Sequence, residues 1–379
     1  MLWTVVNVAR LLLSATFIFS GVVKLVDPMG TAYKIEDYAS AFGTAHWLAA
    51  PLPVLFAVLL ASVEFVLGIQ LFFGVKAKRT TWLTLLFMLV MTPLTLYLFV
   101  SDVVVDCGCF GEAVHLSNGE TLAKNVLLLA LALLLVAYYR YIWTPNTRRT
   151  RWIVSLYAWV FAFGFAATNL YGLPLMDFRP FRTGTDMWQG MNDFEHLTLL
   201  QDFGMWDPVA KDDITEQFLQ QPGYKMLLTM PTVETADDGV MDCLLALSDY
   251  CRLHGYPLYA LTSSNEEAIA HWTDVTGAEY PFCQTDALVL KTMVRSNPGL
   301  VLLHGSVIRG KWASTQLPTG NDLRQPLEET AWAQLDGLSN AGRALRVVLW
   351  FALPLLLITL LDWAWTQWRK RQEKKKQQV

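Results

Sequence analysis

The stretch from Asp106 to Glu112 reads DCGCFGE and lies between two long apolar segments, which predicts a short loop joining two membrane helices. Two cysteines, Cys107 and Cys109, flank a single glycine. Thiolates attack disulfides, and a disulfide across one intervening residue is strained and easily reduced. Gly108 opens backbone conformations closed to other residues. The spacing therefore indicates a redox-active dithiol, with Cys107 and Cys109 as candidate catalytic residues and Glu112 as a supporting one.

The alternative is that the two cysteines are unpaired or hold a metal. Two thiols alone rarely complete a tetrahedral zinc site, and no histidine pair accompanies them, since His115 stands by itself. We therefore predict no metal site.

The composition separates the chain into membrane and soluble parts. Of 379 residues, 54% are hydrophobic and 16% charged, and the mean hydropathy of +0.33 is too high for an ordinary soluble protein. The net charge of −4 gives no reason to expect nucleic acid as a partner. Five cysteines are too few for a disulfide framework. We expect membrane helices plus one soluble domain.

Six apolar segments are long enough to cross a bilayer. They are residues 2–26, 51–73, 82–100, 122–139, 152–173 and 345–365. We expect a four-helix membrane domain at 1–143, a fifth helix at 144–173, a soluble domain at 174–343, and a sixth helix with a basic tail at 344–379.

Lysine and arginine placement predicts the orientation. Three loops or tails are basic and alternate correctly with the helices; they carry Lys76, Lys78 and Arg79, then Arg140, Arg148, Arg149 and Arg151, then the run from Arg369 to Lys376. Residues 101–121 contain no lysine or arginine. The cysteine loop and the soluble domain should therefore face outward with both termini inside, which for a bacterial chain means the periplasm and the inner membrane. That compartment is one where disulfides persist.

Ionisable side chains inside the membrane need partners. Arg10 and Glu64 each lie about nine residues from the inner end of their helix, roughly 13 Å deep at 1.5 Å per residue, which predicts a buried ion pair. A proton or quinone site around Glu64, and an Arg10 that reaches the cytoplasmic interface, are the alternatives. Lys24 and Asp27, at the outer end of the first helix, are expected to be solvated, paired, or at the mouth beneath the cysteine loop.

The outward domain shows alternating strands and helices. Residues 174–213 carry few periodic signals and are interpreted as a linker with a short strand at 198–200. From Gln221 on, the pattern predicts strands at 224–230 and 257–262, helices at 239–254, 266–276 and 286–294, an extended piece at 280–283, and a hairpin from Gly299 to Trp312. This order predicts an α/β sandwich.

The segment from Arg295 to Leu303 resembles the part of the thioredoxin fold that carries its cis-proline. The resemblance implies that Pro298 is cis and lies beside the former active-site position. The Cys-x-x-Cys pair of that fold's redox enzymes is missing, because the corresponding loop at 232–239 has no cysteine. Cys243, nearby, is interpreted as a structural thiol that Cys283 could approach. We expect this domain to bind or position a partner.

The membrane part is similar to the DoxX/MauE family. The matching features are Arg10 ahead of residues 17–25, then Asp27 and Pro28, then Glu64 with Gly68, and CGCFG at 107–111, which corresponds to the cysteine motif of the MauE branch. The resemblance covers about residues 5–139. It implies a four-helix membrane unit tied to envelope thiol–disulfide chemistry, with a thioredoxin-like partner fused downstream. DoxX relatives imply a link to quinone-coupled sulfur oxidation instead.

We therefore expect a thiol–disulfide exchange protein with an envelope client and a membrane quinone as its one candidate cofactor. The alternatives are a non-enzymatic scaffold that binds partners through its thioredoxin-like domain, and a quinone-reactive subunit that uses Glu64.

Overall fold

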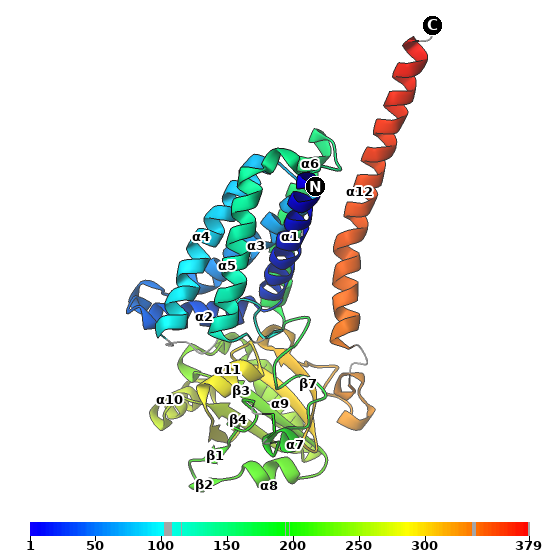
Figure 1. Cartoon of the computed structure of the whole chain (residues 1–379). Helices are drawn as coiled ribbons and strands as arrows, with labels where there is room; N and C mark the ends of the chain where they lie inside the picture. The colour runs from blue at the N-terminus through cyan, green and yellow to red at the C-terminus, as the bar shows by residue number, and fades with distance from the viewer. Residues whose placement is uncertain (102–107, 115, 194, 197, 336–338, 378–379) are drawn as a thin grey trace. The chain divides into compact units, whose positions relative to one another are not determined.

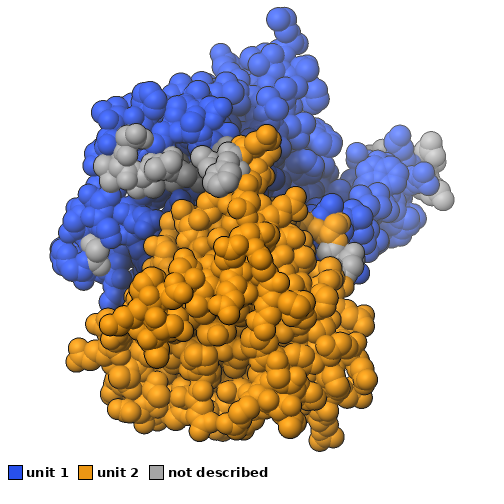
Figure 2. All heavy atoms as spheres, turned by 90° about the horizontal axis from the view of Figure 1, so that it is seen from below, with its two compact units in different colours: residues 1–170, 341–379 blue, residues 171–340 orange. Residues whose placement is uncertain are grey.

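The computed structural model of the chain describes residues 1–101, 108–114, 116–193, 195–196, 198–335 and 339–377 (Figure 1). It divides into two compact units, which Figure 2 colours separately: residues 1–170 with 341–379, and residues 171–340. The first unit is helical and the second contains a mixed sheet.

The helical unit confirms the predicted membrane bundle. Its helices are α1 (Leu2–Val26), α2 (Pro28–Ala41), α3 (Leu52–Phe73), α4 (Ala77–Ser101), α5 (Asn118–Ala137), α6 (Arg148–Tyr171) and α12 (Asn340–Gln377). All except α2 are long and apolar enough to cross a membrane, which gives six such helices within the described residues. Helix α2 was not predicted; Asp27 caps its N-terminus by accepting from Gly30 N (2.9 Å), and Pro28 occupies its first turn.

Helices α1 and α3 pack closely in antiparallel register. A Cβ added to Gly21 would lie 2.6 Å from the Phe65 backbone nitrogen, and one added to Gly68 would lie 2.8 Å from that of Ile18. Small residues let two membrane helices approach to backbone contact. These two contacts fix which levels of α1 and α3 face each other.

The loops gather at two opposite ends of the bundle. At one end, Asn7 near the start of α1 accepts from Trp143 N (3.0 Å). At the other end, Ser20 of α1 contacts the loop between α4 and α5, and Asn169 of α6 donates to Leu25 O (3.2 Å). The connection after α3 also lies at the first end, because a Cβ added to Gly74 would lie 2.8 Å from Trp143 O, and residues 108–114 lie at the second end.

Helix α12 is longer than predicted and continues through the basic tail. Lys, Arg, Gln and Glu favour helix, which explains the extension beyond the apolar stretch. Asp362 joins α12 to the start of α6: it accepts from Thr147 N (2.7 Å), Thr147 Oγ1 (2.6 Å) and Thr150 Oγ1 (2.7 Å).

The described residues of the second unit form a seven-stranded sheet in the order β2-β1-β5-β4-β3-β6-β7. The strands are β1 (Trp206–Asp207), β2 (Asp212–Asp213), β3 (Tyr224–Met230), β4 (Leu258–Thr262), β5 (Phe282–Gln284), β6 (Gly299–His304) and β7 (Val307–Ala313). Strands β3, β4 and β5 are parallel, while β6 and β7 form the terminal hairpin. The predicted α/β architecture is confirmed.

Helices follow the strands as predicted: α9 (Met241–His254), α10 (Glu266–Thr276) and α11 (Ala287–Met293). Two apolar cores lie on opposite faces of the sheet, since Met226 and Leu228 of β3 belong to one and Leu227, between them, belongs to the other.

The interpretation of residues 174–213 as a linker with a strand at 198–200 is wrong. Residues 198–200 form a turn, and the segment instead contributes α7 (Met187–Met191), β1 and β2, followed by α8 (Thr215–Gln220). Phe181, Met187 and Met205 are fully buried in the core that also contains Leu227. The apolar residues of this segment are irregularly spaced because they come from turns, so they show no strand or helix period.

Candidate functional site at the loop between α4 and α5

The cysteine loop is shaped by two glycines in the left-handed region. Gly108 has φ +63° and Gly111 φ +53°, and Gly111 N donates to Gly108 O (3.0 Å). Residues with a side chain rarely adopt such positive φ angles. A Cβ added to Gly111 would also lie 3.0 Å from Val23 Cγ1. Cys107 lies outside the described residues. Cys109, between the glycines, is half-buried.

Helix α1 fixes the position of Cys109. Ser20, which is buried, donates from Oγ to Cys109 O (2.6 Å). The next residue, Phe110, packs edge-on against Phe19 with ring centroids 5.3 Å apart, and Lys124 Nζ of α5 lies 4.1 Å from its ring centroid. The loop is therefore held against α1 and α5 on both sides of the cysteine.

A buried ion pair lies next to this loop. Lys24 Nζ is 2.6 Å from Glu64 Oε2, and the two residues are only 8% and 6% exposed. Lys24 also donates to Ser20 Oγ (3.1 Å), the same hydroxyl that donates to the Cys109 carbonyl. A continuous set of contacts thus joins Glu64 to the backbone of Cys109.

The predicted Arg10–Glu64 ion pair is wrong. Arg10 is buried but donates from Nη1 to Trp143 O (2.7 Å), in the connection between α5 and α6. The packing register places Glu64 opposite Val22, 12 residues above Arg10, or roughly 18 Å by the helical rise. The prediction assumed that the inner ends of α1 and α3 lie at the same depth in the membrane. In the structure, the inner end of α3 lies at the depth of the residues near Arg10, so equal counts from the two ends do not give equal depths.

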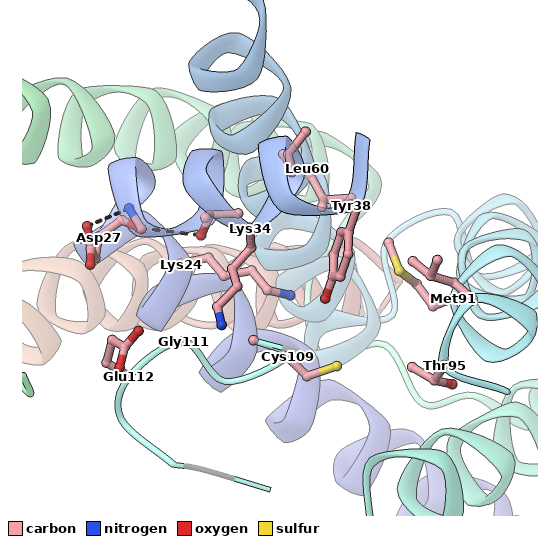
Figure 3. Close-up of a pocket in the computed structure, with 15 residues that line it drawn as sticks. Lys24, Asp27, Lys34, Tyr38, Leu60, Met91, Thr95, Cys109, Gly111 and Glu112 are labelled. Carbon is pink, nitrogen blue, oxygen red and sulfur yellow. Dashed lines mark hydrogen bonds between the residues drawn. The ribbon is translucent and has the colours of Figure 1, made fainter. Parts of the chain in front are cut away.

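A cavity of about 190 Å³ lies beneath the loop, among α1, α2, α3 and α4. Figure 3 shows the side chains of Lys24, Lys34, Tyr38 and Cys109 directed into it. Asp27, Thr95 and Glu112 also line it, and its apolar wall comes from Ile35, Leu60, Met91 and Leu94. Glu112 and Lys24 are thus placed at the same cavity as Cys109.

A second, smaller cavity of about 40 Å³ lies further into the bundle. It is lined by Glu64, Ser20, Lys124 and Asn125, and it shares Lys24 and Cys109 with the first. These two residues therefore stand between the cavities.

The candidate residues of the second unit lie in different surroundings. The Asn297–Pro298 peptide bond is cis, as predicted, and its neighbourhood contacts the loop at 232–239: Asn297 Nδ2 donates to Thr232 O (2.8 Å) and Asp237 N donates to Asn297 O (3.0 Å). Cys243 is half-buried against the core that contains Met226.

Cys283 does not approach Cys243, because the two thiols pack on opposite faces of the sheet. Burial raises the pKa of both Cys251 and Cys283 to about 12, so neither is a nucleophile near neutral pH. No disulfide joins Cys243, Cys251 and Cys283.

Sequence reasoning missed Ser20, Lys34 and Tyr38. Ser20 stands four residues before Lys24, the spacing that puts two side chains on one helix face. The cap at Asp27 and Pro28 is a start signal for α2, and that helix would have brought Lys34 and Tyr38 to the end of the bundle where the cysteine loop lies.

The fold and this site define an integral membrane protein with an α/β unit, whose polar cavity lies at one end of the helical bundle. Residues 2–138, which span α1 to α5, match the family model described as methylamine utilisation protein MauE. No curated protein and no solved structure matches the chain.

Proposed function

We propose that the chain is a membrane-embedded thiol–disulfide exchange protein in which Cys107 and Cys109 cycle between dithiol and disulfide. The observation that carries this proposal is the position of Cys109, held by Ser20 and lining a cavity with Lys24 and Lys34. Cationic neighbours stabilise a thiolate, which is the form that attacks disulfides. The MauE match over residues 2–138 supports a membrane accessory role.

The proposed exchange balances without a further reagent. The Cys109 thiolate attacks one sulfur of a client disulfide, the client S–S bond breaks, and the other client sulfur leaves as a thiolate. Cys107 then attacks the Cys109 sulfur of this mixed disulfide, which releases the client as a dithiol and closes the Cys107–Cys109 disulfide. Two electrons pass from the chain to the client, and two protons pass from its thiols to the client sulfurs. The reverse sequence oxidises a client.

We place the cysteine loop and the α/β unit on the periplasmic side of a bacterial inner membrane, with both termini in the cytoplasm. The basic connections share the other end of the bundle, which supports this orientation. The α/β unit, as a thioredoxin-like domain without a cysteine pair, would dock the envelope client.

A membrane quinone is the cofactor whose chemistry suits the larger cavity. Lys34 and Tyr38 offer hydrogen-bond donors, and Leu60, Met91 and Leu94 offer an apolar wall. When bound, a quinone supplies an acceptor for two electrons and two protons. Glu64 lines the smaller cavity, so if it relays protons to the quinone, Glu64→Gln should stop electron transfer while the protein remains folded.

A scaffold without redox chemistry is the second candidate, and two inert thiols of the α/β unit, Cys251 and Cys283, favour it. Cys251 and Cys283 are buried, with the pKa of each raised to about 12. A domain with such thiols serves a client by binding it.

Redox trapping in cells separates the two candidates. Rapid acid quenching followed by alkylation should find Cys107 and Cys109 in both redox states, and co-purification should yield mixed disulfides with a client. Cys107→Ser with Cys109→Ser should abolish the phenotype, whereas Cys243→Ser is the matched control and should not. A double cysteine variant with the full phenotype, together with loss on deletion of residues 171–340, would establish the scaffold instead.

An impermeant thiol reagent tests the orientation. After mild reduction it should label the loop in intact spheroplasts; labelling confined to inverted vesicles would contradict the proposal.

A further inference from the structure

We propose that Lys24 is a counter-ion shared by Glu64 and the Cys109 sulfur, and that Glu64 takes up the proton that Cys109 loses when it becomes a thiolate. This inference rests on the proposed thiol chemistry of the loop and assigns roles in it to two further residues. Lys24 is a positioning and charge-balancing residue, and Glu64 is the proton acceptor.

The contacts of Lys24 carry the inference. Its amino group lies 2.6 Å from Glu64 Oε2 and 3.1 Å from Ser20 Oγ, and Ser20 holds the Cys109 carbonyl. Lys24 is 8% exposed and Glu64 6% exposed, so water screens this interaction little. The ion pair is therefore tied to the loop that carries the cysteine, and not only to the interface of α1 and α3.

The two cavities supply the route for the proton. Lys24 and Cys109 line both, and Glu64 lines the smaller. A space of about 40 Å³ is large enough for a water molecule, and Ser20, Glu64 and Asn125 offer it polar partners. A proton can thus pass from the sulfur to the carboxylate along hydrogen-bonding groups without crossing the apolar wall.

The step conserves the charge of the buried site. Before it, a neutral thiol shares the cavity with a lysine cation that is paired with a carboxylate; after it, a thiolate shares the cavity with the same cation and the carboxyl group is neutral. The S–H bond breaks, an O–H bond forms on Glu64, and no electron moves. Burying an uncompensated charge is unfavourable, and this exchange avoids it because Lys24 changes its anionic partner.

Arg10 shows what a purely structural buried cation looks like in the same bundle. It donates to a backbone carbonyl at the opposite end, where it holds the connection between α5 and α6. Lys24 instead lies beside a carboxylate and two cavities. A lysine amine is a compact charge on a flexible stem, which suits a change of partner better than a rigid guanidinium.

Other ionisable groups also face the site and set the background against which Lys24 and Glu64 act. They are Asp27 at the N-cap of α2, Lys34 and Tyr38 within α2, Glu112 in the loop and Lys124 in α5.

The test measures how fast iodoacetamide alkylates Cys109 between pH 5 and 10. It uses the reduced full chain in nanodiscs, carries Cys107→Ser to isolate one thiol, and reads the product by mass spectrometry of the loop peptide. Lys24→Gln should raise the pH of half-maximal rate by about one unit, a tenfold loss of thiolate, and Lys24→Arg should recover part of it. Glu64→Gln should lower that pH by a similar amount.

The double variant Lys24→Gln with Glu64→Gln distinguishes a counter-ion shared by Glu64 and Cys109 from two charges that act on Cys109 independently. If Glu64 acts on Cys109 only through its pairing with Lys24, then adding Glu64→Gln to Lys24→Gln should change nothing further. Lys34→Gln with Glu64→Gln is the matched control and should be additive. Additive shifts for Lys24 and Glu64, or no shift in either single variant, would overturn the proposal.

Infrared difference spectra test the proton acceptor directly. The transfer exchanges no proton with the solvent, so it is read at one neutral pH: the spectrum of the reduced Cys107→Ser chain minus that of the same chain with Cys109→Ser should show a protonated carboxyl band, and Glu64→Gln should abolish that band. Absence of that band in the chain that retains Glu64 would overturn the role of Glu64.

These measurements do not depend on a client. If Cys107 and Cys109 cycle in cells but the pH profile of Cys109 alkylation is the same in the Lys24 and Glu64 variants as in the wild type, only the shared counter-ion is refuted. If the variants shift that profile but the cysteines do not cycle in cells, only the exchange function is refuted.

Discussion

The helical unit and the α/β unit both bury charged side chains, but in different surroundings. In the helical unit, Lys24 and Glu64 form a pair beside two cavities and a cysteine loop. In the α/β unit, Asp177 accepts from Arg179 Nε (2.7 Å) and from Lys311, while its backbone oxygen accepts from Asn340 Nδ2 (2.6 Å). This second cluster joins the first residues of the unit to its last.

The same contrast holds for the cysteines. Cys109 lines a cavity with two lysines, whereas Cys251 packs against Met226 with its sulfur 3.6 Å from the Met226 sulfur. Burial in an apolar core suppresses a thiolate, and a cavity with cations favours it. The comparison teaches that burial alone does not determine whether a cysteine is reactive. The polar and charged groups around the thiol determine it.

The largest expected effect is in thiol reactivity. Because burial raises the pKa of Cys251 and Cys283 to about 12, their thiolate fraction at pH 7 should be about three orders of magnitude below that of an ordinary thiol. In the folded, reduced protein, iodoacetamide should modify Cys109 rapidly and these two very slowly. Mass spectrometry of the labelled peptides measures the rates, and unfolding in urea should equalise them. Equal rates in the folded protein would remove the contrast between the units.

The next effect is on the stability of the α/β unit. Burial alone raises the pKa of Asp177, but Lys311 and Arg179 outweigh it and hold that pKa below its usual range. Asp177→Asn leaves two buried cations without their anion, so the free energy of unfolding should fall by about 3–5 kcal/mol. Pulse proteolysis of the full chain in detergent and urea, read at cuts within residues 171–340, measures the change.

An exposed pair in the same unit is the matched control. Asp249 lies 2.6 Å from Arg252 with both side chains more than two-thirds exposed, so Asp249→Asn should change the stability by less than about 0.5 kcal/mol. Equal losses in the two variants would show that burial does not set the strength of these pairs.

The membrane helices and the regular strands could be predicted from the sequence because each has a local signal. A run of apolar residues such as 52–73 admits one interpretation, and the alternation of strand and helix from Tyr224 to Thr276 repeats without interruption. The partner of Glu64 could not be predicted, because it depends on how α1 and α3 slide against each other. Contacts at Gly21 and Gly68 set that register.

The buried segment before β3 was missed for a related reason. Phe181 and Met187 reach the core from turns and a five-residue helix, so their spacing follows tertiary packing and not a local period. Cys109 was found because its motif is local, while Ser20 and Lys34, which complete its surroundings, come from other helices.

A smaller effect should appear in the pH dependence of the α/β unit. Lys225 is fully buried and donates to the carbonyls of Phe218, Leu219 and Gln221, and burial lowers its pKa to about 8. Between about pH 8 and its unfolded value near 10.5, the unfolded chain binds more protons, so stability rises with pH. Across that pH range, the free energy of unfolding of the wild type should rise by about 1–3 kcal/mol relative to that of Lys225→Met. Pulse proteolysis at several pH values tests this, and parallel curves for the two proteins would contradict it.

Apart from the control at Asp249, the smallest effect expected is at Asp362, a half-buried carboxylate of the helical unit. It accepts hydrogen bonds from Thr147 N, Thr147 Oγ1 and Thr150 Oγ1, and so caps the N-terminus of α6. Asp362→Asn should cost about 1–2 kcal/mol, because the amide keeps one acceptor oxygen but loses the charge. Thermal unfolding in nanodiscs measures the loss, with Leu360→Ala, at an exposed position of the same helix, as the control. Since Asp362 is remote from the loop, alkylation of Cys109 should be unchanged, whereas Glu64→Gln should alter it; a change in both would mean that any lost carboxylate perturbs the bundle as a whole.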